Sequence, residues 1–300
     1  MTSRPEPTRI FDRALLTGRR QRAAAAVSDH DFLLARVGDD MAERLAIMRR
    51  TFPLAANIGA HHGLVSRRIE GLAGIETIID VDAAPALVGQ SSNLRVLADE
   101  EALPFADASL DLVVSALSLQ LVNDLPGALI QIRRALKSDG LLLAALLGGA
   151  TLKELREAWL AAESEVSGGA SPRVAPFADV RDMGGLAQRA GFALPVVDSE
   201  TVTVTYQDPL ALMREVKAMG ASNVLSARRR VPVTRCLLLR AAEIYADRFA
   251  LADGRIPATF EILTLTAWAP DESQPKPLRP GSAQARLADV LGVTEGKLKE

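Results

Sequence analysis

The sequence contains little of what several large classes of protein depend on. A single cysteine, Cys236, excludes an internal disulfide and a cysteine zinc site, and it suits a reducing compartment. Aromatic residues make up 4% of the chain, too few for the stacking surfaces that bind single-stranded nucleic acid. The formal net charge of −2 attracts neither nucleic acid nor an anionic membrane surface. We therefore expect no nucleic-acid partner.

Signals for membrane insertion or export are also missing. The most apolar stretch, LLLAALLGGA at 141–150, is shorter than the roughly 18 apolar residues that a membrane span needs. No hydrophobic signal peptide is recognisable at the start. The arginine-rich residues 1–22 fit a transit peptide, a docking segment or a solvated helix face; their acidic residues argue against transit. We expect a cytoplasmic protein without a transmembrane segment.

Apolar strands and helical segments alternate from residue 51 onwards. Strands are predicted at 54–58, 77–81, 94–98, 111–116 and 141–147, with helices between them at 63–71, 85–89 and 125–136. Fully apolar strands in alternating units are typical of a parallel sheet that helices cover on both faces. The pattern therefore predicts an α/β fold.

Helical periodicity dominates the first 50 residues. One apolar stripe comprises Phe32, Leu33, Val37, Met41, Leu45 and Met48, and Ser28 or Asp29 is placed to cap this helix. Later helices are predicted at 152–167, 179–190, 209–220 and 232–248, and later strands at 195–206 and 259–270. We expect a helical segment at 1–50, a main domain at 51–270 and an extended tail at 271–300.

A glycine loop follows the first predicted strand. Gly59 and Gly63 flank Ala60, His61 and His62, and glycine is needed where φ is positive or where backbone approaches a ligand closely. A helix that begins at Gly63 would also present its positive end to an anionic group. The alternative, a tight strand-to-helix turn without a ligand, fits these residues equally well.

Carboxylates follow the next two predicted strands. Asp82 ends the second strand, where it can accept both hydroxyls of a ribose, or else cap the short helix near Pro85. Asp80 lies on the same side of that strand, so one of the two aspartates is expected to be paired elsewhere or exposed. Asp99 and Glu100 follow the third strand, where an acceptor can bind the amine of adenine or form a solvated turn. Ligands in open α/β sheets bind at this edge.

Longer stretches carry a more specific signal. The segment ALPFADASLDLVVSALSLQLVNDLPGALIQIRRALKSDG at 102–140 resembles class I S-adenosylmethionine-dependent methyltransferases. More narrowly, GGATLKELREAW, VKAMGASN and IPATFEI resemble the mitochondrial complex I assembly factors of the arginine-hydroxylase type and their alphaproteobacterial relatives. Phrases similar to KAMGASN and PATFEI also occur in the malonyl-acyl-carrier-protein methyltransferases of biotin synthesis.

The resemblance implies a Rossmann-like, mostly parallel sheet of seven strands with the last antiparallel, and helical insertions at 151–180 and 207–255 over the substrate side. It implies S-adenosylmethionine as cofactor, and a bacterial cytoplasmic protein that a respiratory-complex partner can hold at the inner membrane. The positions that carry over to its site are Gly59, Ala60, His61, Gly63, Asp82, Ala83, Asp99, Glu100 and Ser115. Two positions depart from the family: Asn57 replaces an acidic residue and His61 replaces a loop glycine, which puts the strength of cofactor binding in doubt.

Methyl transfer chiefly requires proximity and alignment, so the lack of a catalytic triad carries no weight. His61 and His62 are weak candidates for a base; the alternative is that they only fill the loop. With His30 distant in sequence, no metal site is expected.

Three functions stay open. They are a methyltransferase-like protein that modifies or helps to assemble a respiratory complex I subunit, a malonyl-acyl-carrier-protein carboxyl methyltransferase, and a non-catalytic assembly chaperone.

Overall fold

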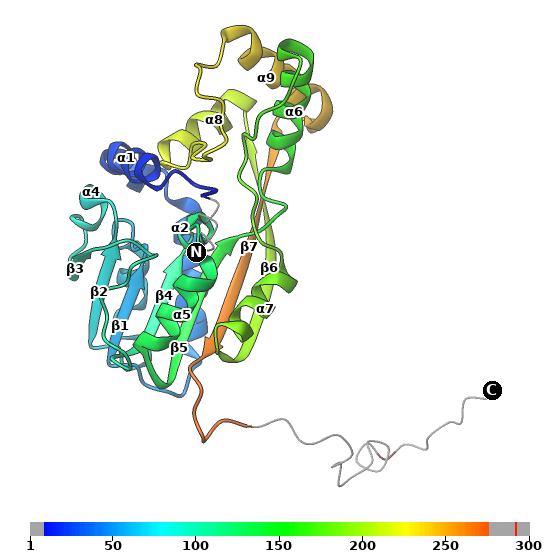
Figure 1. Ribbon diagram of the computed structural model, residues 1–300. Helices are drawn as coiled ribbons and strands as arrows, with labels where there is room; N and C mark the ends of the chain where they lie inside the picture. Colours follow the sequence, from blue (N-terminus) through cyan, green and yellow to red (C-terminus); the bar gives the residue numbers. More distant parts are fainter. Residues whose placement is uncertain (1–8, 276–291, 293–300) are drawn as a thin grey trace, which may run out of the picture. The chain divides into compact units, whose positions relative to one another are not determined.

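The computed structural model describes residues 9–275 and 292. Chain contacts divide the protein into two units, residues 1–270 and 271–300, and everything below concerns the first unit (Figure 1). Most of the tail expected at 271–300 lies outside the described residues, as does Arg4 of the arginine-rich start.

Seven strands make up the sheet: β1 (Leu54–Ile58), β2 (Thr77–Asp82), β3 (Leu94–Leu97), β4 (Leu110–Ala116), β5 (Leu136–Leu147), β6 (Ala193–Tyr206) and β7 (Ile256–Trp268). Their order is β3-β2-β1-β4-β5-β7-β6. The pairs from β3 to β5 are parallel, and β7 is antiparallel to both β5 and β6. The predicted α/β fold with an antiparallel last strand is confirmed.

The helices are α1 (Arg13–Ala23), α2 (Phe32–Ala46), α3 (Leu64–Ile69), α4 (Pro85–Val88), α5 (Leu125–Ala135), α6 (Lys153–Ser167), α7 (Val180–Arg189), α8 (Pro209–Ala218) and α9 (Arg235–Phe249). A 3₁₀ segment at Ala24–Asp29 separates α1 from α2. Because this segment takes up the residues before Asp31, Asp31 rather than Ser28 or Asp29 occupies the N-cap position of α2. The expected cap was wrong by two to three residues.

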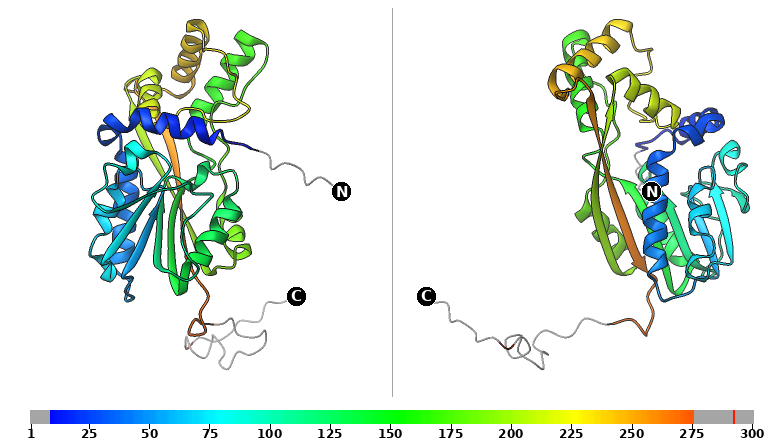
Figure 2. Two further views of the ribbon diagram at one scale, coloured as in Figure 1. Left: turned by 60° about the vertical axis from the view of Figure 1, so that its left-hand side comes forward. Right: turned by 180° about the vertical axis from the view of Figure 1, so that it is seen from behind.

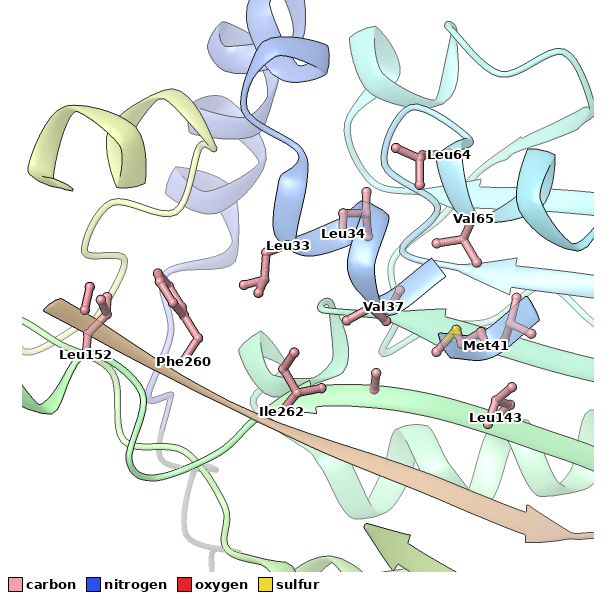
Figure 3. Close-up of a cluster of buried hydrophobic side chains, with 14 of the residues drawn as sticks. Leu33, Leu34, Val37, Met41, Leu64, Val65, Leu143, Leu152, Phe260 and Ile262 are labelled. Atoms are coloured by element: carbon pink, nitrogen blue, oxygen red, sulfur yellow. The ribbon is translucent and has the colours of Figure 1, made fainter. Parts of the chain in front are cut away.

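Two apolar cores sandwich the sheet, as the uniformly apolar strands predicted. On one face, the stripe of α2 packs with α3 against alternate residues of the strands (Figure 3). Val37, Met41 and Leu45 of this stripe are buried. On the other face, α5 and α7 pack against the intervening residues through Leu129, Ile132 and other side chains. Full burial of an aliphatic side chain contributes about 1.5–3 kcal/mol.

Helices gather at the edge where the parallel strands end. Figure 1 shows α1, α6, α8 and α9 at this end of the sheet, and Figure 2 shows the β6–β7 pair running past the other strands toward α8 and α9. Short backbone contacts tie the start of α1 to the loop after α8: Phe11 forms a β-bridge with Leu225, and Asp12 N donates to Val224 O at 2.8 Å. Helices therefore cover the edge at which a ligand is expected.

Candidate functional site

The glycine loop is a tight turn that packs against two serines. Gly59 and Gly63 have φ of +69° and +75°, which only glycine adopts without strain. A Cβ on Gly59 would lie 2.1 Å from Cβ of Ser118, and one on Gly63 would lie 3.1 Å from Cβ of Ser91. Helix α3 spans only Leu64–Ile69. The close approaches that require glycine here are to protein side chains, and the helix is shorter than predicted.

His61 lies at the centre of this loop with a strained backbone. Its φ is +51°, unusual for a residue other than glycine. Its ring nitrogen Nε2 lies 3.2 Å from Ala116 O, so Nε2 carries a proton and donates it. Burial, followed by the charge of Arg20, lowers the pKa of His61 to about 3. A neutral imidazole with so low a pKa is a poor general base at neutral pH.

Asp82 ends β2, as predicted, and it is fully buried there; it does not cap α4. Its Oδ1 accepts from Ala84 N at 2.8 Å, and its Oδ2 accepts from His61 N at 3.0 Å. Arg20 Nη1 lies 3.9 Å from Oδ2. Burial raises the pKa of Asp82, and the charge of Arg20 opposes that rise. The carboxylate therefore lies where a ribose-binding acid was expected, with a guanidinium beside it.

Glu100 is buried in the turn that follows the neighbouring strand β3, within a compact ionic group. Arg13 Nη2 donates to Glu100 and, at 2.8 Å, to Asp99 Oδ1, while Arg20 Nη1 lies 3.4 Å from Glu100 Oε1. Ser118 Oγ also donates to Glu100. Burial alone would raise the pKa of Glu100, but Arg20 and Arg13 outweigh it and lower the pKa to about 2. Asp99 and Glu100 are thus ion-paired to α1 and do not form a solvated turn.

A second buried polar group lies beneath the glycine loop. Asp80 accepts hydrogen bonds from Ser66, Ser91 and, at 3.1 Å, from Asn93 Nδ2. Asn57 Nδ2 donates to Ser66 Oγ at 2.9 Å. The expectation that one of the two β2 aspartates is paired elsewhere is confirmed, because hydroxyls and an amide satisfy Asp80 while Asp82 faces Arg20. Asn57 therefore joins β1 to α3 through Ser66, and its Oδ1 has no hydrogen-bond partner among the described residues.

The remaining predicted positions are structural in this conformation. Ser115 is fully buried and its hydroxyl donates to Ile58 O at 2.7 Å. Ala60 is buried and its N donates to Val81 O, whereas Ala83 is only partly buried. His62 is 3% exposed, and its Nε2 lies 3.0 Å from Asp31 Oδ2. These residues surround the strand tips, and their direct role in cofactor binding stays a prediction.

A cavity of about 420 Å³ opens beside the strand tips. Its lining is mostly apolar and comes from α1, the start of α2, the ends of β4 and β5, α6, α8 and the loops at 173–177 and 219–224. Arg20 and His61 lie at the border between this cavity and the carboxylates. Arg173 stacks over Trp159 with 4.7 Å between its Cζ and the ring centroid, and it donates to buried Glu163 at 2.9 Å. The cavity has the size and lining of a substrate site.

Three residues of the site were missed in the sequence: Arg13, Arg20 and Asp31. Arg13 and Arg20 belong to the arginine-rich start, for which local docking was one of the open interpretations. Both arginines pair with Glu100, which lies 80 residues from Arg20 and 87 residues from Arg13 along the chain. No local pattern in the sequence therefore connects them. The signal available was the density of arginines on one short helix.

Comparison with known proteins agrees with this geometry. A methyltransferase-domain family matches residues 56–144. The mitochondrial arginine-hydroxylase NDUFAF5 of Danio rerio is 37% identical, over 97% of this chain and 91% of its own length. The human NDUFAF5 is 38% identical over 95% and 84%. This chain belongs to the methyltransferase-domain family that includes the NDUFAF5 arginine-hydroxylases. A malonyl-[acyl-carrier protein] O-methyltransferase of Laribacter hongkongensis is 35% identical over 83% and 86%.

Solved structures support the fold. The YcgJ protein of Bacillus subtilis matches 79% of this chain and 99% of its own at a TM-score of 0.54, with 15% identity. Phosphoethanolamine N-methyltransferase 2 of Haemonchus contortus, in complex with phosphomonomethylethanolamine and S-adenosylhomocysteine, matches 85% of this chain and 59% of its own at a TM-score of 0.53, with 15% identity. The second match is to a named methyltransferase, and this chain shares its fold. The matched methyltransferase domain supports S-adenosylmethionine as the cofactor.

The residues at the strand tips fit a nucleoside cofactor in kind and place. Asp82 at the end of β2 and Glu100 in the turn after β3 supply buried acceptors, and a mostly apolar cavity adjoins them. Both acceptors already pair with arginines of α1. The hydroxyls of a ribose must therefore replace part of the contact that Arg20 now makes with the carboxylate of Asp82. Within residues 9–275, no three His, Cys, Asp or Glu side chains are grouped to hold a metal ion.

Proposed function

We propose that this methyltransferase-like protein binds S-adenosylmethionine at the tips of β1 to β3 and modifies an arginine side chain of a protein. The observation that carries the proposal is the pair of buried carboxylates, Asp82 and Glu100, which share Arg20 next to a cavity of substrate size. The kinship with arginine-hydroxylases over nearly the whole chain supports the arginine substrate.

When bound, S-adenosylmethionine supplies a methyl group at a sulfonium centre. In this proposal Asp82 accepts hydrogen bonds from the ribose, and each such charge-assisted bond is worth about 1.5–3 kcal/mol. Asp99 and Glu100 hold the amine of the adenine. The neutral ring of His61 shapes the border between cofactor and cavity and takes no proton, because its pKa is about 3. The cavity wall then aligns the substrate side chain with the methyl group, and this alignment is the main source of rate enhancement.

The modified partner is proposed to be a subunit of respiratory complex I, which the chain modifies or helps to assemble. The basis is the family resemblance of the segments at 148–159 and 216–223, together with the NDUFAF5 relatives. Association with the membrane would then come from the partner. Within the described residues, no helix is long and apolar enough to cross a membrane. The insertions at 151–180 and 207–255, whose residues line the cavity, are proposed to contact the partner.

A second candidate rests on the 35% identity with a malonyl-[acyl-carrier protein] O-methyltransferase. This enzyme acts on an acidic group and would need a cationic residue facing the substrate. Arg20 and Arg173 line the cavity, but both are already paired with carboxylates; the third basic residue of the lining, Lys217, is exposed. A deletion strain that grows only with biotin would favour this candidate. The proposed function predicts growth without biotin.

Isothermal titration with S-adenosylmethionine tests the cofactor site. We expect binding by the wild-type chain and a loss of tenfold or more in Asp82→Asn, because the amide cannot accept both ribose hydroxyls. Asp80→Asn is the matched control, since Asp80 is equally buried on the same strand but faces the serines. Thermal melts verify that both variants fold. No binding by the wild-type chain would favour a non-catalytic chaperone, and normal binding by Asp82→Asn would refute the ribose assignment.

Mass spectrometry of complex I subunits from a deletion strain tests the reaction. A methyl group that is lost from an arginine would identify methyl transfer, and a lost oxygen would identify hydroxylation. Unchanged arginine masses in a strain whose complex I still assembles would contradict a modifying role.

A further inference from the structure

Asp31 is the only acidic residue in the described part of the chain that lines the cavity. Its side chain is 18% exposed, and its Oδ2 lies 3.0 Å from Nε2 of His62. The rest of the lining is apolar, apart from neutral polar side chains, two histidines and three basic residues. A carboxylate in such surroundings is costly unless a partner compensates its charge.

Comparison with the other aspartate caps shows that Asp31 is unusual. The N-cap residues of α1, α5, α7 and α8 are also aspartates, namely Asp12, Asp124, Asp179 and Asp208. Each of the four accepts a hydrogen bond from the backbone N–H three residues later. Asp31 makes no such bond, and its ψ is 12° where the other four lie between 73° and 171°. A cap of this kind is worth about 1 kcal/mol, and the α2 position forgoes it.

The backbone turn instead brings the carboxylate to His62. Burial lowers the pKa of His62 in spite of the favourable charge of Asp31, so the imidazole is neutral near pH 7. A neutral ring can donate one hydrogen bond to Asp31 and fix its orientation, but it cannot cancel its negative charge. His62 Nδ1 has no hydrogen-bond partner among the described residues. The negative charge at the cavity wall therefore remains uncompensated by His62.

The basic residues of the lining do not compensate it either. Arg20 is paired with Glu100 and Asp82, and Arg173 is paired with Glu163. His30 lies 2.9 Å from Glu215. Lys217 is exposed, where water solvates its ammonium. Among the described residues, no basic side chain of the lining therefore neutralises the charge of Asp31.

We propose that Asp31, oriented by His62, receives the cationic head group of the substrate side chain, a guanidinium. The inference rests on the proposed function, to which it adds the residue that selects a cation. A guanidinium offers donors to both oxygens of a carboxylate and packs its stem against apolar surface. Gln120 lines the same cavity, and its Oε1, which has no partner within the described chain, is a further acceptor for the remaining N–H groups.

Binding of small probes tests the proposal directly. The full chain is titrated with N-acetyl-arginine amide and with N-acetyl-citrulline amide, which has nearly the same shape without the charge. We expect Asp31→Asn to lose tenfold or more in affinity for the arginine probe, and Asp31→Glu to retain most of it. Asp179→Asn is the matched control, because Asp179 is also an N-cap but does not line the cavity. Thermal melts check that each variant is folded.

Equal affinity of the wild-type chain for the arginine and citrulline probes would overturn the proposal. So would full binding of the arginine probe by a folded Asp31→Asn, or tighter binding of malonate than of the arginine probe. The outcome is separate from the cofactor test. If the chain bound the arginine probe through Asp31 but not S-adenosylmethionine, the proposed function would fail while the cation site would stand.

Discussion

Two regions at the same edge of the sheet differ in whether basic side chains neutralise their carboxylates. At the tips of β2 and β3, Asp82 and Glu100 are satisfied by Arg13 and Arg20 from α1. In the adjoining cavity, Asp31 is held by a neutral histidine. A ligand at the first region must exchange with an internal ion pair, whereas a cation at the second supplies a missing charge. Under the proposed function, cofactor binding is therefore tied to α1 and substrate binding to the start of α2.

The largest expected effect comes from breaking the buried ion pairs. Glu100→Gln leaves Arg13 and Arg20 without their shared charged partner, and we expect the free energy of unfolding to fall by about 3–5 kcal/mol. Asp107→Asn removes a carboxylate from an exposed pair with Arg134 and should change the stability by less than about 0.5 kcal/mol. Urea denaturation measures both. A loss below about 1 kcal/mol in Glu100→Gln would show that the ionic group is not what holds α1.

The pH dependence of stability should report the same group. The pKa of Glu100 is lowered from 4.5 to about 2 in the folded state. A lowered carboxylate pKa stabilises the fold above the unfolded value, and the contribution is lost as the pH falls through the folded value. We therefore expect the stability difference between the wild-type chain and Glu100→Gln to shrink by about 3 kcal/mol between pH 4.5 and pH 2. A constant difference over that range would contradict a charged Glu100.

Glycine substitutions separate backbone strain from packing. Gly71 has φ of +73° and open space around a Cβ, so Gly71→Ala should lose only about 1 kcal/mol from the positive φ. Gly59 has a similar φ, but its Cβ would collide with Ser118, and Gly59→Ala should lose about 3 kcal/mol. Thermal melts compare the two variants. Equal losses would mean that Ser118 moves aside easily.

The smallest effect concerns His61, whose ring stands between the two regions. His61→Gly removes the ring and relieves the positive φ, so the affinity for S-adenosylmethionine should rise, by about tenfold at most. Calorimetric titration measures the change. Unchanged or weaker affinity would mean that the imidazole contributes to the cofactor site.

The sheet was predictable because its signals are local. Apolar strands such as 54–58 and 77–81 alternate with helical periodicity, and Asp82 and Glu100 follow strands at which ligands are expected. The partners of these carboxylates were not predictable. Arg13 and Arg20 reach across 80 residues or more to Glu100, and only the folded chain brings them together. The position of Asp31 at the start of α2 was not predictable either. The 3₁₀ segment before it moves the N-cap from Ser28 or Asp29, where it was expected, to Asp31.

The most direct test of the central claim removes the ribose hydroxyls and the carboxylate together. S-adenosylhomocysteine and its 2′,3′-dideoxy analogue are titrated into the wild-type chain and into Asp82→Asn. We predict that the wild-type chain binds the dideoxy analogue at least tenfold more weakly, and that Asp82→Asn hardly distinguishes the two ligands. Equal discrimination by both proteins would contradict the account, because the hydroxyls would then be bound somewhere other than Asp82.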